Sequence, residues 1–249
     1  MRLLTIIFFI LCFTGNAHTS PKPKKLLLVV AMNTEANPII ATLHLKEQKD
    51  IFTPLPMRAF SGQYHHTQIM LVLNGIDPVN HVQNIGTEAA TLSTYLGISH
   101  FHPDLVISVG TAGGVKENHS AINNIYISER IYFYDRRLPF EGYRQYGEGD
   151  YLAANLPSSA TYGLKPGIIC SGDSFDDSKI DFAIFLKKKC VAIDMEAAAV
   201  AWVSMLTHTP MFAIKGVTNF VTGDDAHSEY QKNLPKVTQE LAEKIKRIL

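Results

Sequence analysis

Short apolar runs rich in β-branched residues alternate along the chain with segments of helical periodicity. Residues 26–31 are apolar throughout, as expected of a strand that is covered on both faces. Residues 68–73 and 105–109 have the same character, and residues 82–96 between them have helical spacing. Because strands that alternate with helices build parallel or mixed sheets, we predict an α/β fold: a single-domain three-layer α/β/α sandwich with a central mixed sheet.

The same alternation continues to the C-terminus. Further strands are predicted at residues 167–170, 190–193 and 211–217, and helices at residues 196–207 and 236–249. Because ligands of such sheets bind at the carboxyl ends of the strands, we expect the functional residues directly after these runs.

Residues 132–152 break the regular alternation. They are loop-like and rich in aromatic side chains. Long loops of this kind usually have a function, so we expect a lid or a subunit contact here.

The length and charge of the chain limit the class of ligand. With 249 residues, 46% of them hydrophobic, the chain is long enough for one domain with a sizeable core, which we place at residues 25–249. Lys plus Arg is 23 and Asp plus Glu is 23, so no net positive field attracts nucleic acid or an anionic membrane. A small, modestly charged ligand fits this composition better.

Residues 1–17 are predicted to be a secretory signal peptide. Arg2 gives a positive start, residues 3–13 are an apolar run, and small residues precede a cut after Ala17. The polar residues 18–24 form a linker, which argues against a buried first strand. Since the apolar run is shorter than the roughly 20 residues that span a bilayer, we predict no stable membrane anchor. We expect a secreted or periplasmic protein.

Two cysteines remain in the predicted mature chain. Cys12 belongs to the signal peptide, and Cys170 and Cys190 do not. In an oxidising compartment these two can form a disulfide. Their spacing does not show that they are close, so two small apolar core residues remain the alternative.

Three polar or glycine-rich segments follow predicted strands. Residues 110–114 (GTAGG) are expected to form a tight turn whose N–H groups can hold a phosphate or a sugar oxygen, or a plain connection. The segment has neither the Walker nor the Rossmann spacing. Residues 171–175 (SGDSF) lack the spacing of a nucleophile elbow. Residues 194–196 (DME) place two carboxylates at a helix start, where they can simply complement the helix dipole.

The histidines show no metal-binding spacing. His65, His66, His100 and His102 lack the i, i+4 pairing of a helical zinc site. We predict no metal and no cofactor.

Taken together, five segments at strand ends resemble those of the methylthioadenosine/S-adenosylhomocysteine nucleosidases, in the same order and at roughly the same spacing, with the plant-type enzymes the most similar. The five segments are residues 31–36 (AMNTEA), 109–114 (VGTAGG), 171–175 (SGDSF), 194–197 (DMEA) and 215–219 (KGVTN). The resemblance runs from about Lys25 to the C-terminus. It implies a nucleoside phosphorylase-like fold, a homodimer, and hydrolysis of the N-glycosidic bond of a purine nucleoside.

The resemblance assigns the activation of water to Glu35. In the family this carboxylate is the acid/base that prepares a water for attack on the anomeric carbon. Met32 and Tyr230 would pack around the sugar and its 5′ substituent. The residues near the water, the ribose and the base would be Thr111, Ala112 and Gly113.

The resemblance also implies how the base and the sugar are held. Phe175 would stack on the purine, and the backbone of Asp176 would read its Watson–Crick edge. Met195 and Glu196 would hold the ribose, Glu196 through the 2′- and 3′-hydroxyls. A carboxylate suits this role because it accepts two hydrogen bonds and offsets positive charge on an oxocarbenium-like sugar.

The residues predict water rather than phosphate as the nucleophile. A phosphorylase must compensate a phosphate dianion, normally with arginine and glycine N–H donors. Ser108 stands where the hexameric phosphorylases carry an arginine. Glu35, facing the same space, would repel phosphate.

Asn219 departs from the family. The nucleosidases have an aspartic acid at this catalytic position, which protonates N7 of the leaving adenine. Asn cannot deliver a proton, and general acid catalysis typically contributes about 10²- to 10⁴-fold. Three alternatives remain open: a 6-oxopurine nucleosidase, a purine nucleoside phosphorylase, and a non-catalytic nucleoside-binding or storage protein. Because Glu35, Phe175 and Glu196 are retained, we predict an active nucleosidase.

Overall fold

The computed structural model describes residues 23–154, 162–176, 178–223 and 225–249. The predicted signal peptide and residues 18–22 of the predicted linker lie outside these ranges. Within the part of the chain that the structure describes, no helix is long and apolar enough to cross a membrane.

Four parallel strands form the middle of a mixed sheet. They lie in the order β4 (Thr67–Leu73), β1 (Lys25–Val30), β5 (Leu105–Gly114) and β10 (Met211–Phe220). The edge beyond β4 is antiparallel, with β3 (Arg58–Tyr64) followed by β2 (Lys46–Gln48). Strand β1 is almost completely buried, as its uninterrupted apolar run predicts.

Beyond β10 the sheet closes on itself. Strand β10 pairs antiparallel with β6 (Ile125–Phe133). Strand β6 pairs parallel with β8 (Lys165–Ser171), and β8 pairs parallel with β9 (Cys190–Asp194). Strand β9 returns to β5, which also pairs with β10. The predicted mixed sheet is thus confirmed, and these five strands form a closed ring within it. The strand ends of the ring therefore converge.

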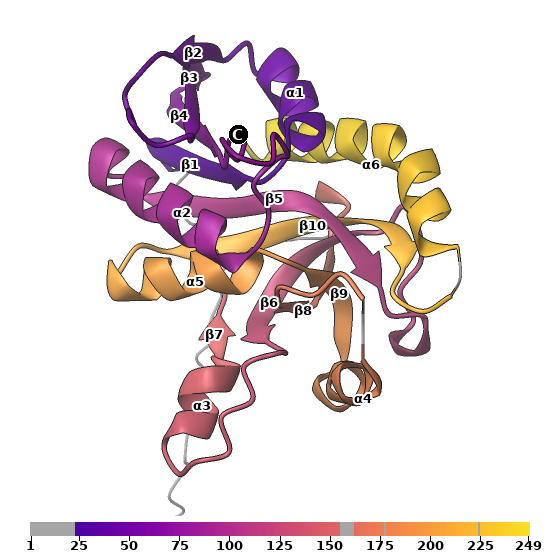
Figure 1. The fold of residues 1–249 in the computed structure, drawn as a ribbon. Coiled ribbons are helices and arrows are strands. Elements are labelled where there is room, and N and C mark those ends of the chain that lie inside the picture. Colours follow the sequence, from indigo (N-terminus) through magenta and orange to yellow (C-terminus); the bar gives the residue numbers. More distant parts are fainter. Residues whose placement is uncertain (1–22, 155–161, 177, 224) are drawn as a thin grey trace, which may run out of the picture.

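Helices cover both faces of the parallel part, which confirms the three predicted layers (Figure 1). Helices α1 (Asn33–Thr42) and α6 (Ala226–Ile248) pack together on one face, and α2 (Thr87–Phe101) and α5 (Ala197–Leu206) on the other. Two apolar clusters fill the space between the helices and the two faces of the sheet.

Smaller elements flank the ring. Helix α4 (Lys179–Lys188) packs on β9. Near it, Cys170 and Cys190 form a disulfide between neighbouring strands, with Cα atoms 5.8 Å apart. The disulfide resolves the alternative that the sequence left open. Of the aromatic segment 132–152, the first two residues belong to β6. The rest consists of irregular backbone, the short helix α3 (Tyr143–Glu148) and the short strand β7 (Tyr151–Leu152), which pairs with β6.

Three sequence-based boundaries are wrong, each for a physical reason. Residues 110–114 form no turn but continue β5, because all of them are paired with β10 and the last two, Gly113 and Gly114, also with β9. Helix α2 begins at Thr87 rather than residue 82, because Gly86 has a φ of +96° that a helix interior excludes. Helix α6 begins ten residues earlier than predicted; the polar side chains of Glu229 and Asn233 fasten its first turns to β10, and hydrophobic periodicity does not report such contacts.

Candidate active site

Two adjoining cavities of about 250 and 220 Å³ lie where β1, β5, β8, β9 and β10 end. We name them the Asp176 cavity and the Glu35 cavity after a residue that lines each alone. They share six lining residues: Gly113, Phe175, Ile193, Asp194, Met195 and Asn219. Together they reach the range of about 300–1,000 Å³ that is typical of small-ligand sites.

Glu35 is held in the first turn of α1, which directly follows β1. Its Oε1 accepts hydrogen bonds from the N–H (2.6 Å) and the hydroxyl (2.7 Å) of Thr111, and its Oε2 accepts one from the N–H of Met32 (3.2 Å). A Cβ at Gly110 would lie 3.0 Å from Oε1, so a glycine in β5 permits this close approach. Burial raises the pKa of Glu35 above its usual value, although its hydrogen-bond donors act in the opposite direction. The carboxyl group is therefore suited to exchange a proton.

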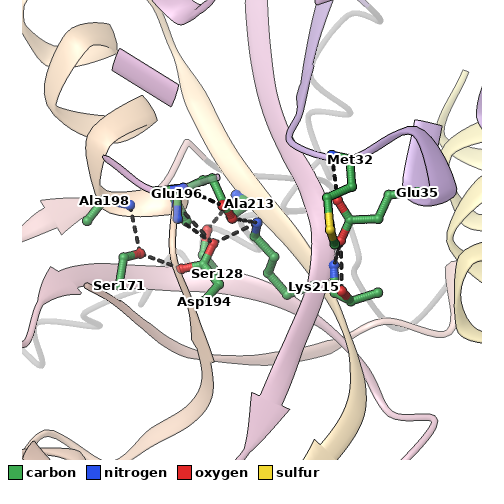
Figure 2. A network of polar contacts seen from close by, with 12 residues as sticks. Met32, Glu35, Ser128, Ser171, Asp194, Glu196, Ala198, Ala213 and Lys215 are labelled. Carbon is green, nitrogen blue, oxygen red and sulfur yellow. Dashed lines mark hydrogen bonds and ion pairs between the residues drawn. The ribbon is translucent and has the colours of Figure 1, made fainter. Parts of the chain in front are cut away.

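Lys215 is a buried cation among carboxylates (Figure 2). It lies in the middle of β10 with 1% of its surface exposed, and its Nζ is 2.6 Å from Asp194 Oδ2 and 3.7 Å from Glu196 Oε2. A Cβ at Gly110 would meet Nζ at 3.3 Å, so Lys215 also approaches the strand face that Glu35 contacts. Burial alone would lower the pKa of the Lys215 ammonium, but the surrounding carboxylates raise it above its usual value. The lysine therefore stays charged and partly neutralises the site.

Glu196 stands at the start of α5 and reaches the start of α2. Its Oε1 accepts a hydrogen bond from the N–H of Gly86 at 3.2 Å, and 12% of its side chain is exposed. Burial raises the pKa of Glu196 to about 7, because Lys215 offsets only part of the cost of an ionised carboxylate there. The helix dipole of α2 favours the ionised form at this position.

Asp194 anchors this network from the end of β9. Its Oδ2 accepts a hydrogen bond from the N–H of Ala197 (2.9 Å), and its Oδ1 accepts one from the hydroxyl of Ser171. Ser171 in turn accepts a hydrogen bond from the N–H of Ala198 at 2.9 Å. Figure 2 shows the contacts that join Ser171 at the end of β8, Asp194 at the end of β9 and Ala198 in α5. Asp194 is thus a positioning residue for both Lys215 and α5.

Phe175 and Asp176 line the Asp176 cavity from the loop after β8. Phe175 is 60% exposed, and Asp176 is exposed beside it. Asn219 lines both cavities and is 6% exposed. Its Oδ1 accepts a hydrogen bond from Thr218 (2.9 Å), and its Nδ2 donates one to the carbonyl of Phe220 (3.1 Å). One N–H of the amide remains for a ligand.

The first turns of α6 also line the Glu35 cavity, through His227 and Tyr230. The Tyr230 hydroxyl lies 3.7 Å from the sulfur of Met32. Burial, with the negative charge of Glu35 nearby, raises the pKa of Tyr230 to about 12, so its hydroxyl keeps its proton.

The structure brings all predicted site residues together around these cavities, and their roles remain predictions. They are Met32, Glu35, Thr111, Ala112, Gly113, Phe175, Asp176, Met195, Glu196, Asn219 and Tyr230. Sequence reasoning did not assign a role to Lys215, Asp194 or His227. The first two lie inside the segments that carry the family resemblance, whereas no sequence signal points to His227. Among the described residues, no cluster of three His, Cys, Asp or Glu side chains could hold a metal ion.

The charge of the site favours an uncharged or cationic ligand. The described residues that line the cavities include four carboxylates, those of Glu35, Asp176, Asp194 and Glu196, and no lysine or arginine. Lys215 lies behind them and is already paired. An incoming anion would find uncompensated negative charge, whereas a water molecule can donate to Glu35.

The comparisons with known proteins agree with this geometry. The family model of the phosphorylase superfamily matches residues 25–249. The 5′-methylthioadenosine/S-adenosylhomocysteine nucleosidase of Arabidopsis thaliana is 36% identical over 90% of each chain, and the 5′-methylthioadenosine nucleosidase of the same plant is 33% identical over 86% of this chain and 82% of the relative.

A solved structure of the Arabidopsis thaliana 5′-methylthioadenosine nucleosidase in apo form has a TM-score of 0.88 at 31% identity. The match covers 92% of this chain and 95% of that one. The chain therefore belongs to the phosphorylase superfamily, in the family of the 5′-methylthioadenosine/S-adenosylhomocysteine nucleosidases.

Proposed function

We propose that the chain is a purine nucleosidase that hydrolyses the N-glycosidic bond of nucleosides of the methylthioadenosine and S-adenosylhomocysteine type. The substrate class follows the names of its plant relatives. The observation that carries the proposal is Glu35, a buried carboxylate that Thr111 holds at the edge of a cavity. The described residues that line this cavity include no lysine or arginine. Such a carboxylate can accept a proton from water but repels phosphate.

The purine occupies the Asp176 cavity in this mechanism. Phe175 stacks on its face, and the backbone of Asp176 meets its polar edge. The ribose lies at the junction of the Asp176 cavity and the Glu35 cavity. There Met195 contacts the sugar, and the carboxylate of Glu196 accepts hydrogen bonds from its 2′- and 3′-hydroxyls.

Glu35 takes a proton from the water that attacks the anomeric carbon as the bond from that carbon to N9 breaks. The electron pair of this bond stays on the purine, which takes up a proton from solvent because Asn219 has none to give. As positive charge grows on the sugar, the ionised Glu196 stabilises it.

Asn219 supports a second candidate substrate, a 6-oxopurine nucleoside. Its amide lines the same cavity as Phe175 and keeps one N–H donor, but it has no proton to transfer to N7. A 6-oxopurine offers an acceptor oxygen that such an amide can bond. In this candidate Asn219 recognises the base and is not a weakened acid.

The proposal is tested by incubating the protein that begins at residue 18 with methylthioadenosine, inosine and guanosine. We expect release of free base, fastest from methylthioadenosine. Faster release from inosine or guanosine would establish the 6-oxopurine candidate. Tight binding of all three without release of any base would show a binding or storage protein and refute the enzyme.

We also propose a homodimer that closes the site. Phe140, Tyr143 and Tyr146 of the aromatic segment are 68%, 59% and 56% exposed, and Val79 and Val82 on the loop before α2 are 78% and 58% exposed. Apolar surface of this kind on a neutral chain is typical of an interface. Analytical ultracentrifugation at micromolar concentration should give a dimer; a monomer with full activity would contradict this proposal.

Export is the third proposal, and the disulfide supports it. Disulfides persist mainly in oxidising compartments, and Cys170 and Cys190 are paired in β8 and β9. Fusion of residues 1–24 to an alkaline phosphatase that is active only after export should give activity. Absence of activity, with the fusion protein intact inside the cell, would contradict the predicted signal peptide.

A further inference from the structure

The N-terminus of α2 is capped by two other parts of the chain. The first N–H groups of a helix have no partner within the helix, and Gly86, at the N-cap position, has no side chain to supply one. The N–H of Gly86 donates instead to Glu196 Oε1 at 3.2 Å. The next N–H, that of Thr87, donates to Asp173 Oδ1 at 2.7 Å. Consecutive N–H groups thus hold two carboxylates, one of them from the loop after β8.

Asp173 makes a second contact with the same residue of α2. Its Oδ2 accepts a hydrogen bond from the hydroxyl of Thr87 at 2.6 Å. A Cβ at Gly86 would lie 2.8 Å from Asp173 Oδ1, so a glycine at this position permits the close approach. Thr87 is buried, whereas Asp173 is exposed. The carboxylate therefore fixes the start of α2 from the surface, where its removal leaves the core intact.

The loop that carries Asp173 is held independently on its other side. The N–H of Asp173 donates to Asp135 Oδ2 at 2.7 Å. The hydroxyl of Tyr134 donates to the carbonyl of Ser174, also at 2.7 Å. Tyr134 and Asp135 directly follow β6. Loss of the Asp173 carboxylate therefore leaves the loop attached beside β6 and releases the start of α2.

We propose that Asp173 is a positioning residue for Glu196: it holds the start of α2 so that the N–H of Gly86 stays on the carboxylate of Glu196. Because a glycine backbone turns freely, Gly86 can withdraw its N–H once Thr87 is released. Asp173 is not among the described residues that line the two cavities, so it acts through Glu196 and not on the substrate. The inference rests on the proposed function only in that Glu196 binds the ribose.

The ionisation of Glu196 reports whether the N–H of Gly86 is in place. The titratable groups that act on Glu196 or face it are Glu35 in α1, Asp194 in β9, Lys215 in β10 and Tyr230 in α6. Burial and the two carboxylates raise the pKa of Glu196 to about 7, whereas the lysine and the N–H of Gly86 act in the opposite direction. Removal of the Asp173 side chain leaves the four groups unchanged. The pKa of Glu196 should then rise because the N–H is lost.

The first test measures this ionisation without any substrate, by carbon-13 NMR of protein labelled at the glutamate carboxyl carbon. The signal of Glu196 is assigned by its absence in Glu196→Gln. We expect its titration midpoint to move to higher pH in Asp173→Ala. In Asp173→Asn the midpoint should stay or move lower, because asparagine keeps an oxygen for the N–H of Thr87 and loses only the charge.

Asp104→Ala is the matched control for this titration. Asp104 is also an exposed carboxylate that accepts two backbone N–H groups, but it precedes β5 and so lies at the opposite ends of the parallel strands. The control should leave the midpoint of Glu196 unchanged. An unchanged midpoint in Asp173→Ala, or an equal rise in Asp173→Asn, would overturn the inference.

Kinetics on methylthioadenosine provide the second test. At pH 6, Asp173→Ala should lower kcat/KM by about tenfold, which corresponds to the loss of one hydrogen bond to a charged group. At pH 8, where most of Glu196 is ionised, the loss should be smaller, and Asp173→Asn should stay within a few-fold at both pH values. Equal losses at pH 6 and pH 8 would show a merely structural role and overturn the inference. If the unchanged protein releases no base, the proposed function fails, and the NMR titration still decides the inference.

Discussion

The sugar side and the base side of the site are built in different ways. On the sugar side Glu35 and Lys215 are 3% and 1% exposed, and every charge contacts another group of the network. On the base side Phe175 is 60% exposed and lies in the loop after β8. The bond-breaking groups are therefore fixed by the core of the fold, whereas Phe175 and Asp176 lie on an exposed loop that can change at less cost to stability.

The comparison also explains where the chain departs from its family. The sugar side keeps each carboxylate that the resemblance assigns to it, and its members depend on one another through Lys215. A change in one member leaves a buried charge without a partner. The side-chain hydrogen bonds of Asn219 that the structure describes join it to its neighbours Thr218 and Phe220, so an exchange with aspartic acid there removes no partner of Lys215.

The largest effect is expected at the sugar side, from Glu35→Gln. The substitution removes the proton acceptor but keeps the shape, so we expect a loss of about 10²- to 10⁴-fold in kcat with nucleoside binding within about tenfold. Steady-state kinetics and calorimetry measure the two quantities. Glu240→Gln, on the surface of α6, is the control for loss of a carboxylate. Activity within a few-fold of the unchanged protein would remove Glu35 from the mechanism.

The substitution Lys215→Met should have the second largest effect, and the quantity that it lowers is the free energy of unfolding. Without the ammonium, Asp194 and Glu196 remain buried without a counter-charge, which costs about 3–5 kcal/mol in the free energy of unfolding. Urea denaturation at pH 8 measures the loss, and the loss should shrink at pH 5, where Glu196, whose pKa is raised to about 7, can protonate. Arg130→Met, which breaks the exposed pair of Arg130 with Asp150, should change stability by less than about 1 kcal/mol. Equal effects of the two variants would contradict a buried network.

The pH dependence of activity should report the same network. Glu196 must be ionised to accept the ribose hydroxyls, and its pKa is raised to about 7. We therefore expect kcat/KM to level off above pH 7 and to fall about tenfold per pH unit below 7. The fall should be steeper at the pH values where Glu35 also becomes protonated.

The sign for stability is the opposite. Because the pKa of Glu196 is higher in the folded chain than in the unfolded one, this group makes the fold less stable as pH rises from about 4.5 to about 7, and adds no further change above that. A flat pH profile of kcat/KM between 5 and 8 would exclude Glu196 as the group that must ionise.

Asn219→Asp should have the smallest effect, and it tests the base side. A restored acid can protonate N7 as the bond breaks, so we expect the rate on methylthioadenosine to rise by about tenfold or more. If the natural substrates are 6-oxopurines, the same variant should lower the rate on inosine, because the amide donor is lost. Unchanged rates on both would show that Asn219 does not face the base, and its assigned role would be wrong.

The sugar side was accessible from the sequence because its residues follow predicted strands. Glu35 follows the first apolar run and Glu196 follows another, and the carboxyl ends of such strands converge at one edge. Hydrophobic periodicity alone was sufficient to predict the strands β1 and β4 and the layers around them. The role of each residue came from the family resemblance.

Features that depend on pairing between distant segments were not accessible. The contact of Lys215 with Asp194 joins two strands 21 positions apart, and nothing local requires it. The glycines at 110–114 indicated a turn because glycine is typical of turns; in the structure Gly110 is needed for space within a strand. His227 was missed because polar contacts, not an apolar stripe, extend α6 to Ala226.

The central claim, that water is the nucleophile, is tested most directly by the identity of the sugar product. The mature protein is incubated with methylthioadenosine in the presence and absence of excess inorganic phosphate, and the products are followed by proton and phosphorus NMR. We expect free adenine and free methylthioribose at the same rate in both samples. Formation of the pentose 1-phosphate, or base release only when phosphate is present, would contradict the assignment of Glu35 and identify the chain as a phosphorylase.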